Sequence, residues 1–159
     1  MALVKGTNSY VDLAEATVYF TDRLDVDAWD IAADLEKEKA LATATAMLDN
    51  MNWTGYSVSD AQPLAFPRSG EYFDPRVGTD VILNTTEIPL RIAKATYELA
   101  YHLLNNDGLL DDTGSVDSLE VGSIVLTDIR PTELIPATVT ALTAPLLRNR
   151  GAHLWWRAN

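Results

Sequence analysis

The sequence predicts a mainly α fold: a four-helix bundle with a long Pro/Gly-containing loop and a small β-hairpin or strand before the last helix. Three observations predict it. Apolar residues recur at helical spacing, capping or acidic residues precede these segments, and prolines gather in one stretch. The 159 residues match the usual size of one domain. We expect a helical domain at residues 1–148, followed by a separate docking segment, residues 149–159.

The first predicted helix spans residues 12–25. Asp12 can accept a hydrogen bond from the first turn while Glu15 reaches back, which is the arrangement of a capping box. The apolar residues that follow at helical spacing form one face: Leu13, Ala16, Phe20 and Leu24. We expect Trp29, in the acidic connection after this helix, to fill part of the core.

The next two helices are predicted at residues 34–51 and 88–105. The first of them opens with acidic residues, which favour a helix N-terminus. Its expected buried stripe is Leu41, Ala44, Leu48 and Met51. The second has Pro89 in its first turn, where a missing amide costs no hydrogen bond. Its apolar surface is wide, so we expect a central helix packed on both sides.

Residues 56–87 are predicted to be a long irregular loop, because three prolines interrupt any regular pattern. Residues 81–83 could form a short strand. Alternating residues at 118–127 predict a hairpin or one bulged strand around Gly122. The last helix is expected at residues 136–148, where Pro145 must either kink it or mark a final turn without its usual hydrogen bond.

The residue inventory argues against several kinds of active site. There is no cysteine, which removes disulfides and thiolate chemistry, and the two histidines lie 51 positions apart without zinc-site spacing. The sequence contains no phosphate-binding glycine loop and no GxSxG motif. We therefore expect a chain that is not an enzyme and has no cofactor. No apolar run approaches the ~18 residues of a membrane span, so we also expect no membrane contact.

Charge is distributed unevenly along the chain. The net charge is −11, from 23 acidic and 12 basic residues. Affinity for nucleic acid comes largely from cations that neutralise phosphates, so an acidic body is a poor groove for DNA. No acid follows Glu133, whereas three arginines do. The C-terminal part is therefore basic and aromatic on an acidic body.

This basic segment is the sharpest candidate for binding a partner, because tryptophan and arginine are the residues most enriched at interface hot spots. The alternative is that the segment packs on its own bundle. The candidate residues are Arg148, Arg150, His153, Leu154, Trp155, Trp156 and Arg157.

A second candidate lies between two prolines, which hold residues 62–68 in extended geometry. Two apolar side chains can then point the same way. Either the segment folds back over the bundle, or it is an arm that contacts a neighbouring subunit. The candidate residues are Gln62, Leu64, Phe66 and Arg68.

Five segments occur in a fixed order: SYVDLAEATVYF, AMLDNMNWTGYS, QPLAFPRSG, IPLRIAKATYELAYHL and APLLR. Together they resemble small phage proteins often labelled DnaT-like single-stranded-DNA-binding, which sit among head-morphogenesis genes. The helical plan is also similar to that of head–tail connector (adaptor) proteins of tailed phages. The resemblance covers about residues 8–148.

We use charge to choose between these two labels. Single-strand binders need a positive groove with aromatic stacking platforms, whereas residues 1–147 carry 23 acids and 9 bases. We therefore identify the chain as a connector and expect no binding of single-stranded DNA at physiological salt. The resemblance then implies a homo-oligomeric ring of about twelve copies, docked on the portal protein and adjoining tail or nozzle proteins. DNA would pass through its channel without specific binding.

The implied location is the neck of the virion, after assembly in the host cytoplasm. The resemblance assigns no catalytic, cofactor-binding or metal-binding residue. The alternative function is a single-stranded-DNA-binding accessory protein of phage replication. A third and weaker possibility is a small-molecule enzyme with a site under the loop at residues 56–87.

Overall fold

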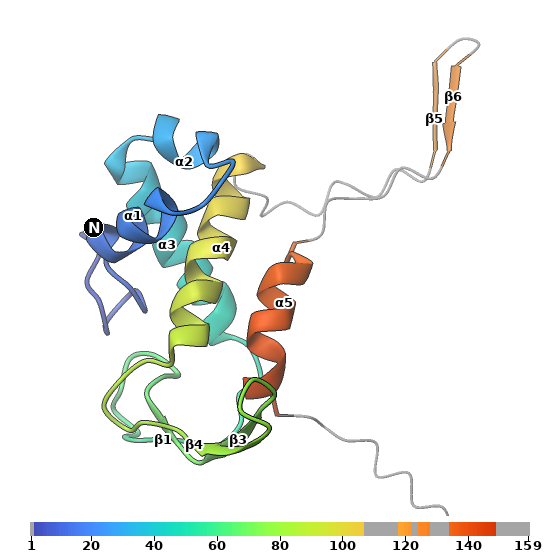
Figure 1. The fold of residues 1–159 in the computed structure, drawn as a ribbon. Coiled ribbons are helices and arrows are strands. Elements are labelled where there is room, and N and C mark those ends of the chain that lie inside the picture. The colour runs from blue at the N-terminus through green and yellow to red at the C-terminus, as the bar shows by residue number, and fades with distance from the viewer. Residues whose placement is uncertain (1, 107–117, 122–123, 128–133, 149–159) are drawn as a thin grey trace, which may run out of the picture.

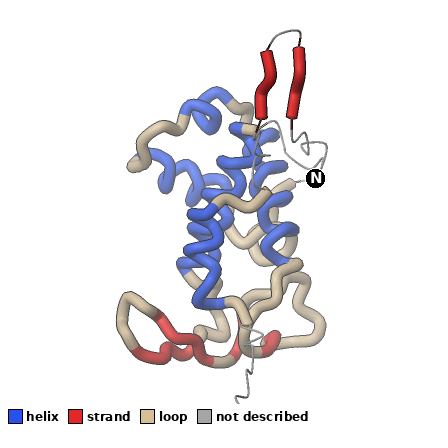
Figure 2. The backbone as a smooth tube through the Cα atoms, turned by 90° about the vertical axis from the view of Figure 1, so that its right-hand side faces the viewer, coloured by secondary structure: helices blue, strands red, loops and turns tan. Residues whose placement is uncertain are grey.

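The computed structural model describes residues 2–106, 118–121, 124–127 and 134–148. The helices gather in one body, and β1 to β4 lie at one end of it (Figures 1 and 2). The helices are α1 (Leu13–Thr21), α2 (Asp27–Ile31), α3 (Asp34–Asp49), α4 (Leu90–Asn105), α5 (Ala137–Thr143) and the 3-10 helix η1 (Ala144–Leu146). The strands are β1 (Tyr56–Ser57), β2 (Arg68–Ser69), β3 (Glu71–Asp74), β4 (Thr79–Ile82), β5 (Ser118–Val121) and β6 (Ile124–Thr127).

The predicted four-helix bundle is wrong, because the fold is mixed α and β. Five α-helices and three two-stranded antiparallel sheets are present in the described ranges. The sheets pair β1 with β2, β3 with β4, and β5 with β6. Strands β1 to β4 fall inside the predicted loop at residues 56–87, where β4 overlaps the short strand suggested for residues 81–83. They are only two to four residues long, too short for an alternating pattern to stand out. The hairpin of β5 and β6 is one of the two forms predicted for residues 118–127.

Two helix boundaries also differ from the prediction. Helix α1 ends at Thr21 rather than near residue 25, and a separate five-residue helix, α2, follows it. Five residues cannot display helical periodicity, so α2 could not be predicted from the spacing of apolar residues. Helix α5 gives way to η1, which contains Pro145. Because proline has no amide hydrogen, the chain tightens into a final 3-10 turn there, as one of the two predicted alternatives requires.

Helices α3 and α4 form the centre of the core. Helix α4 contacts α2, α3 and α5, which confirms the predicted central helix. Small residues, including Ala44 and Ala100 at 0% exposure, lie among the buried side chains and permit close helix–helix approach. Of the predicted stripe on α3, Leu41 and Leu48 are fully buried, and Met51 is partly buried just beyond the helix.

Aromatic side chains join α1 and α2 to α4. The Phe20 and Trp29 rings lie 4.4 Å apart between centroids, and Tyr19 stacks on Tyr97 at 4.8 Å. Trp29 is 1% exposed, which confirms its predicted place in the core. Burying an aromatic ring removes on the order of 150–250 Å² from water, so this cluster stabilises the position of α2 despite its short length.

The capping box of α1 forms as predicted. The Glu15 amide donates to Oδ1 of Asp12 at 2.7 Å, and the Asp12 amide donates to Oε2 of Glu15 at 3.2 Å. The two bonds satisfy amides that the helix itself leaves unpaired. The predicted apolar face holds at Ala16 and Phe20, but Leu24 lies beyond the helix and is 92% exposed.

No helix in the described part of the chain is long and apolar enough to cross a membrane.

Candidate functional site

Strands β1 to β4 form one layer at the end of the helical body, and we call residues 52–89 the β end. Gly70 links β2 directly to β3, and its carbonyl accepts the Leu83 amide at 2.9 Å. Gly55 has a φ of +70°, and a Cβ placed on it would lie 2.2 Å from the Ser69 carbonyl oxygen. Only glycine fits this close approach, which lies beside the Tyr56–Ser69 pair of β1 and β2.

The guanidinium of Arg68 fastens this layer to the preceding loop. It donates to three backbone carbonyls: Thr54 at 2.7 Å, Gly55 at 2.8 Å and Ala65 at 3.2 Å. Burial lowers the pKa of Arg68. The Arg68 side chain therefore donates to carbonyls of its own chain, although the sequence suggested Arg68 as a contact to a neighbouring subunit.

The other candidates in residues 62–68 also turn inward. Phe66 is 2% exposed and packs edge-on against Tyr10 and Trp53, with ring centroids 6.0 and 5.1 Å apart. Leu64 is 9% exposed. The Gln62 amide donates to the carbonyls of Leu64 at 2.6 Å and Pro67 at 3.1 Å. The segment therefore covers its own core, which was the alternative to an arm.

A buried carboxylate organises the β3–β4 turn. Asp74 is 1% exposed and accepts from Arg76 at 2.6 Å and from Arg91 at 2.8 Å. The Arg76 side-chain hydrogen bonds, with further help from its amide and from Arg91, hold the pKa of Asp74 well below its usual range against the opposing effect of burial. Asp74 is thus an anion at neutral pH, and it ties the turn to the first turns of α4.

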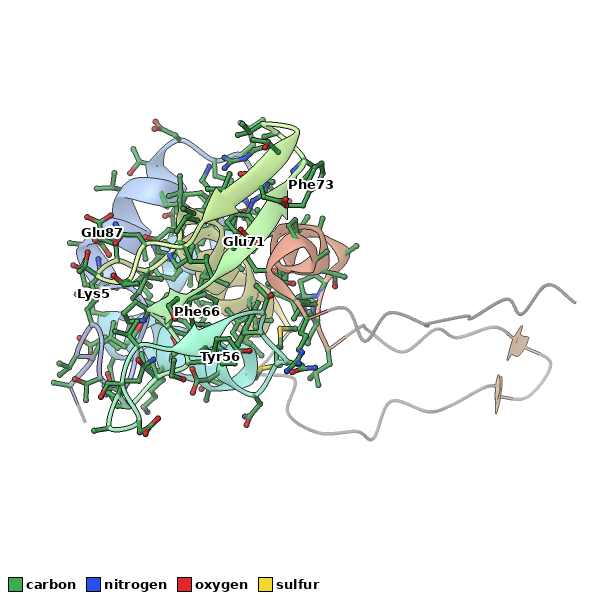
Figure 3. The ribbon with its side chains drawn as sticks, turned by 90° about the horizontal axis from the view of Figure 1, so that it is seen from below. Lys5, Tyr56, Phe66, Glu71, Phe73 and Glu87 are labelled. Carbon is green, nitrogen blue, oxygen red and sulfur yellow. The ribbon has the colours of Figure 1, made fainter. Side chains whose placement is uncertain are left out.

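The outer face of the β end carries exposed aromatic rings. Tyr56 is 75% exposed and Phe73 is 56% exposed, and both lie on this layer as seen from below (Figure 3). In the β3–β4 ladder, Phe73 pairs with Asp80 and Glu71 pairs with Ile82, so apolar and acidic side chains share the outer face. The two accessible rings can stack on other flat rings, whereas the acidic side chains on the same face would repel phosphate.

An open hollow of about 700 Å³ borders this layer. Phe66 and Tyr97 contribute to its lining, and the Lys5–Glu15 ion pair lies at its edge. Figure 3 shows Lys5 and Glu87 on the same side of the molecule as the β end. Among the described residues, no group of three or more His, Asp or Glu side chains could hold a metal ion.

The last described residues of the chain, up to Arg148, lie at the β end. The Arg148 amide donates to the Asn52 carbonyl at 2.8 Å, and the Thr54 amide donates to the Leu146 carbonyl at 2.9 Å. Arg148 itself is exposed, which adds a cation beside the layer. The other predicted residues of the C-terminal segment lie outside the described residues: Arg150, His153, Leu154, Trp155, Trp156 and Arg157.

Tyr56, Phe73 and Arg76 were not among the residues predicted from the sequence. One sequence signal does indicate the β3–β4 hairpin, which carries Phe73 and Arg76. Residues 74–78 read Asp-Pro-Arg-Val-Gly, with proline at the second turn position and glycine where φ is +76°. The Val77 amide closes this turn on the Asp74 carbonyl at 3.0 Å.

A comparison with known families finds one match that spans nearly the whole chain. Residues 2–157 match the family described as "Putative DnaT-like ssDNA binding protein". No curated protein and no solved structure matches the chain.

This match contradicts the identification as a head–tail connector, together with the portal-binding and virion-assembly roles that followed from it. It favours the alternative that the sequence analysis set aside. Net charge misled that choice, because it does not show where aromatic rings such as Tyr56 and Phe73 are exposed. The predicted ring, its partners, the neck location and the absence of enzymatic activity are untested and stay predictions.

Proposed function

We propose that this chain, which belongs to the family of DnaT-like ssDNA binding proteins, binds single-stranded DNA at its β end. The bases would stack on Tyr56 and Phe73. The observation that carries the proposal is the exposure of these two rings, 75% and 56%, on one layer of a chain with this family membership. Exposed aromatic rings can act as stacking platforms for any base, because every base has a π face.

Stacking, rather than charge, would supply most of the affinity. The β end, residues 52–89, contains five acids and two arginines, and Arg148 lies beside it. The Arg76 side chain is 62% exposed even though it pairs with Asp74, so it can still approach a phosphate. Each neutralised phosphate contributes a slope of about −0.7 in log K against log salt for a single strand. With two available arginines we expect a shallow slope, about −1 to −2.

The test is fluorescence anisotropy of a labelled oligothymidine titrated with the full chain at two or more salt concentrations. Tyr56→Ala and Phe73→Ala should each weaken binding by about 5- to 150-fold, because stacking contributes roughly 1–3 kcal/mol per base. Tyr56→Phe keeps the ring and should bind like the unaltered chain.

Val58→Ala is the matched control, since Val58 is 47% exposed one residue beyond β1 but offers no ring. It should leave the affinity unchanged. Two results would refute the proposal: no binding even at low salt, or undiminished binding by the Tyr56→Ala/Phe73→Ala double variant. A slope much steeper than −2 would show that phosphate contacts elsewhere dominate.

A further inference from the structure

The end of the molecule opposite the β end is a strongly acidic surface, residues 18–38, which we call the acidic crest. Residues 18–38 contain seven acids and two bases. Both bases are already engaged: Arg23 pairs with Glu98 at 3.0 Å and Lys37 with Asp34 at 3.8 Å. The surplus of negative charge therefore faces outward.

Large apolar side chains are exposed among these acids. Leu24 is 92% exposed, Ile31 is 84% and Leu35 is 54%. The helices that carry or adjoin them pack together, because Phe20 of α1 packs on Trp29 of α2 and the Lys37 ammonium of α3 lies 5.5 Å from the Trp29 ring centroid. Exposed apolar groups ringed by charge mark interaction sites in soluble proteins.

The crest also contains a depression of about 290 Å³ with unsatisfied hydrogen-bond donors. Arg23 and Trp29 both line it. Nη1 of Arg23 and Nε1 of Trp29 are buried and have no acceptor within the described part of the chain. Buried donors are almost always paired, so this site fits an occupant that brings acceptors such as peptide carbonyl groups.

An occupant of the crest should therefore be a peptide with cations for the acids, bulky apolar side chains for the exposed surface, and carbonyls for the two donors. Residues 148–157 of this same sequence have these properties, with three arginines, two tryptophans and no acid. This segment departs at Arg148, beside Asn52 at the β end.

The positions of the two surfaces make the contact intermolecular. Helix α4 separates the two surfaces. Near the last turns of α4, Tyr101 donates to the Asp25 carbonyl, just before α2. Near its first residue, Arg91 pairs with Asp74 of the β end.

The 16 residues of α4 span about 24 Å. Even when fully extended, the seven residues from Arg148 to Trp155 span about 25 Å, so only the last residues of the segment could reach the crest of the same copy, whereas Arg148 is held at the β end. The crest of a second copy is therefore the better-placed target.

We propose that residues 148–157 of one copy dock on the acidic crest of the next copy. The two surfaces differ, so the contact is heterologous and joins copies head to tail. The inference does not depend on DNA binding, because it uses other residues and can be read without DNA.

The first experiment measures the mass of the full chain by sedimentation velocity over a range of concentrations. The unaltered chain should associate as concentration rises, and more weakly at high salt. Leu24→Ser/Ile31→Ser should weaken association at least tenfold. Ile82→Ser is the matched control, because Ile82 is 81% exposed on β4, away from the crest, and it should leave association unchanged.

The second experiment mixes two charge-reversed variants. Asp22→Lys/Asp27→Lys/Asp30→Lys/Glu38→Lys leaves three acids against six bases at residues 18–38 and so makes the crest basic. Arg148→Glu/Arg150→Glu/Arg157→Glu makes the segment acidic. Each variant alone should remain monomeric because its two surfaces repel, whereas an equimolar mixture should associate again. Asp60→Lys/Glu71→Lys/Asp80→Lys/Glu87→Lys, the same charge change at exposed positions of the β end, should not alter the association of an otherwise unaltered chain.

Three outcomes would overturn the proposal. The unaltered chain could be monomeric at every concentration, which would leave the crest to a segment of its own chain. Association could survive the crest variants, which would place the contact elsewhere. The mixed variants could fail to associate although each has the circular dichroism spectrum of the unaltered chain, which would exclude charge pairing between these two surfaces.

Discussion

The acidic crest and the β end both expose large apolar side chains, but they use their charged groups differently. At the β end, Asp74 is buried between two arginines, and Arg68 donates to three backbone carbonyls. At the crest, seven acids face only two bases, and those bases pair locally. Charge at the β end therefore stabilises the chain's own loop. Surplus charge at the crest is available to another molecule.

This comparison predicts that stability and surface function can be altered separately. Phe66→Ala should destabilise the fold by about 3–5 kcal/mol, because it removes a buried ring from between Tyr10 and Trp53. Phe73→Ala removes the same side chain from an exposed position and should cost within about 0.5 kcal/mol. Chemical denaturation of both variants measures the difference. Equal losses would mean that Phe73 also supports the layer.

A smaller effect tests whether the pairing of β1 with β2 depends on close backbone approach at Gly55. Gly55→Ala should cost about 2–3 kcal/mol, since φ is +70° and the new Cβ would meet the Ser69 carbonyl. Gly78→Ala has nearly the same φ, +76°, but meets open space. It should lose only the conformational part, about 1–2 kcal/mol. Thermal unfolding that ranks the two variants in the opposite order would contradict this account of the close approach.

The helical half of the fold was predictable because its signals are long. Helices α3 and α4 each run for 16 residues, enough for apolar spacing to show which face is buried. The capping box at Asp12 is a local pattern and needs no tertiary information. The strands of the β end are set by tertiary contacts instead. Nothing local reveals that Gly55 must pass against Ser69.

The exposed aromatic rings were missed for the same reason. A residue's face on a strand follows from its register, and strands of two to four residues give no alternation to read. Leu24 shows the opposite error. Its spacing continues the apolar face of α1, but the helix ends at Thr21, so Leu24 never reaches that face. Net charge failed as well, because −11 for the whole chain does not show which charged groups are paired or which aromatic rings are exposed.

The smallest expected effect on stability distinguishes an exposed side chain of the crest from a buried side chain of the core. Leu24→Ser should change the free energy of unfolding by no more than about 0.5 kcal/mol, because a side chain that is 92% exposed gains little burial on folding. Ala16→Ser, on the buried face of the neighbouring helix, places a hydroxyl at 0% exposure and should cost more, about 1–3 kcal/mol. Urea denaturation at low protein concentration, where copies do not associate, measures both. A loss above 1 kcal/mol for Leu24→Ser would show that Leu24 is covered within its own chain. The crest would then be a stabilising contact of the monomer, and its contrast with the β end would lie only in how its charged groups are paired.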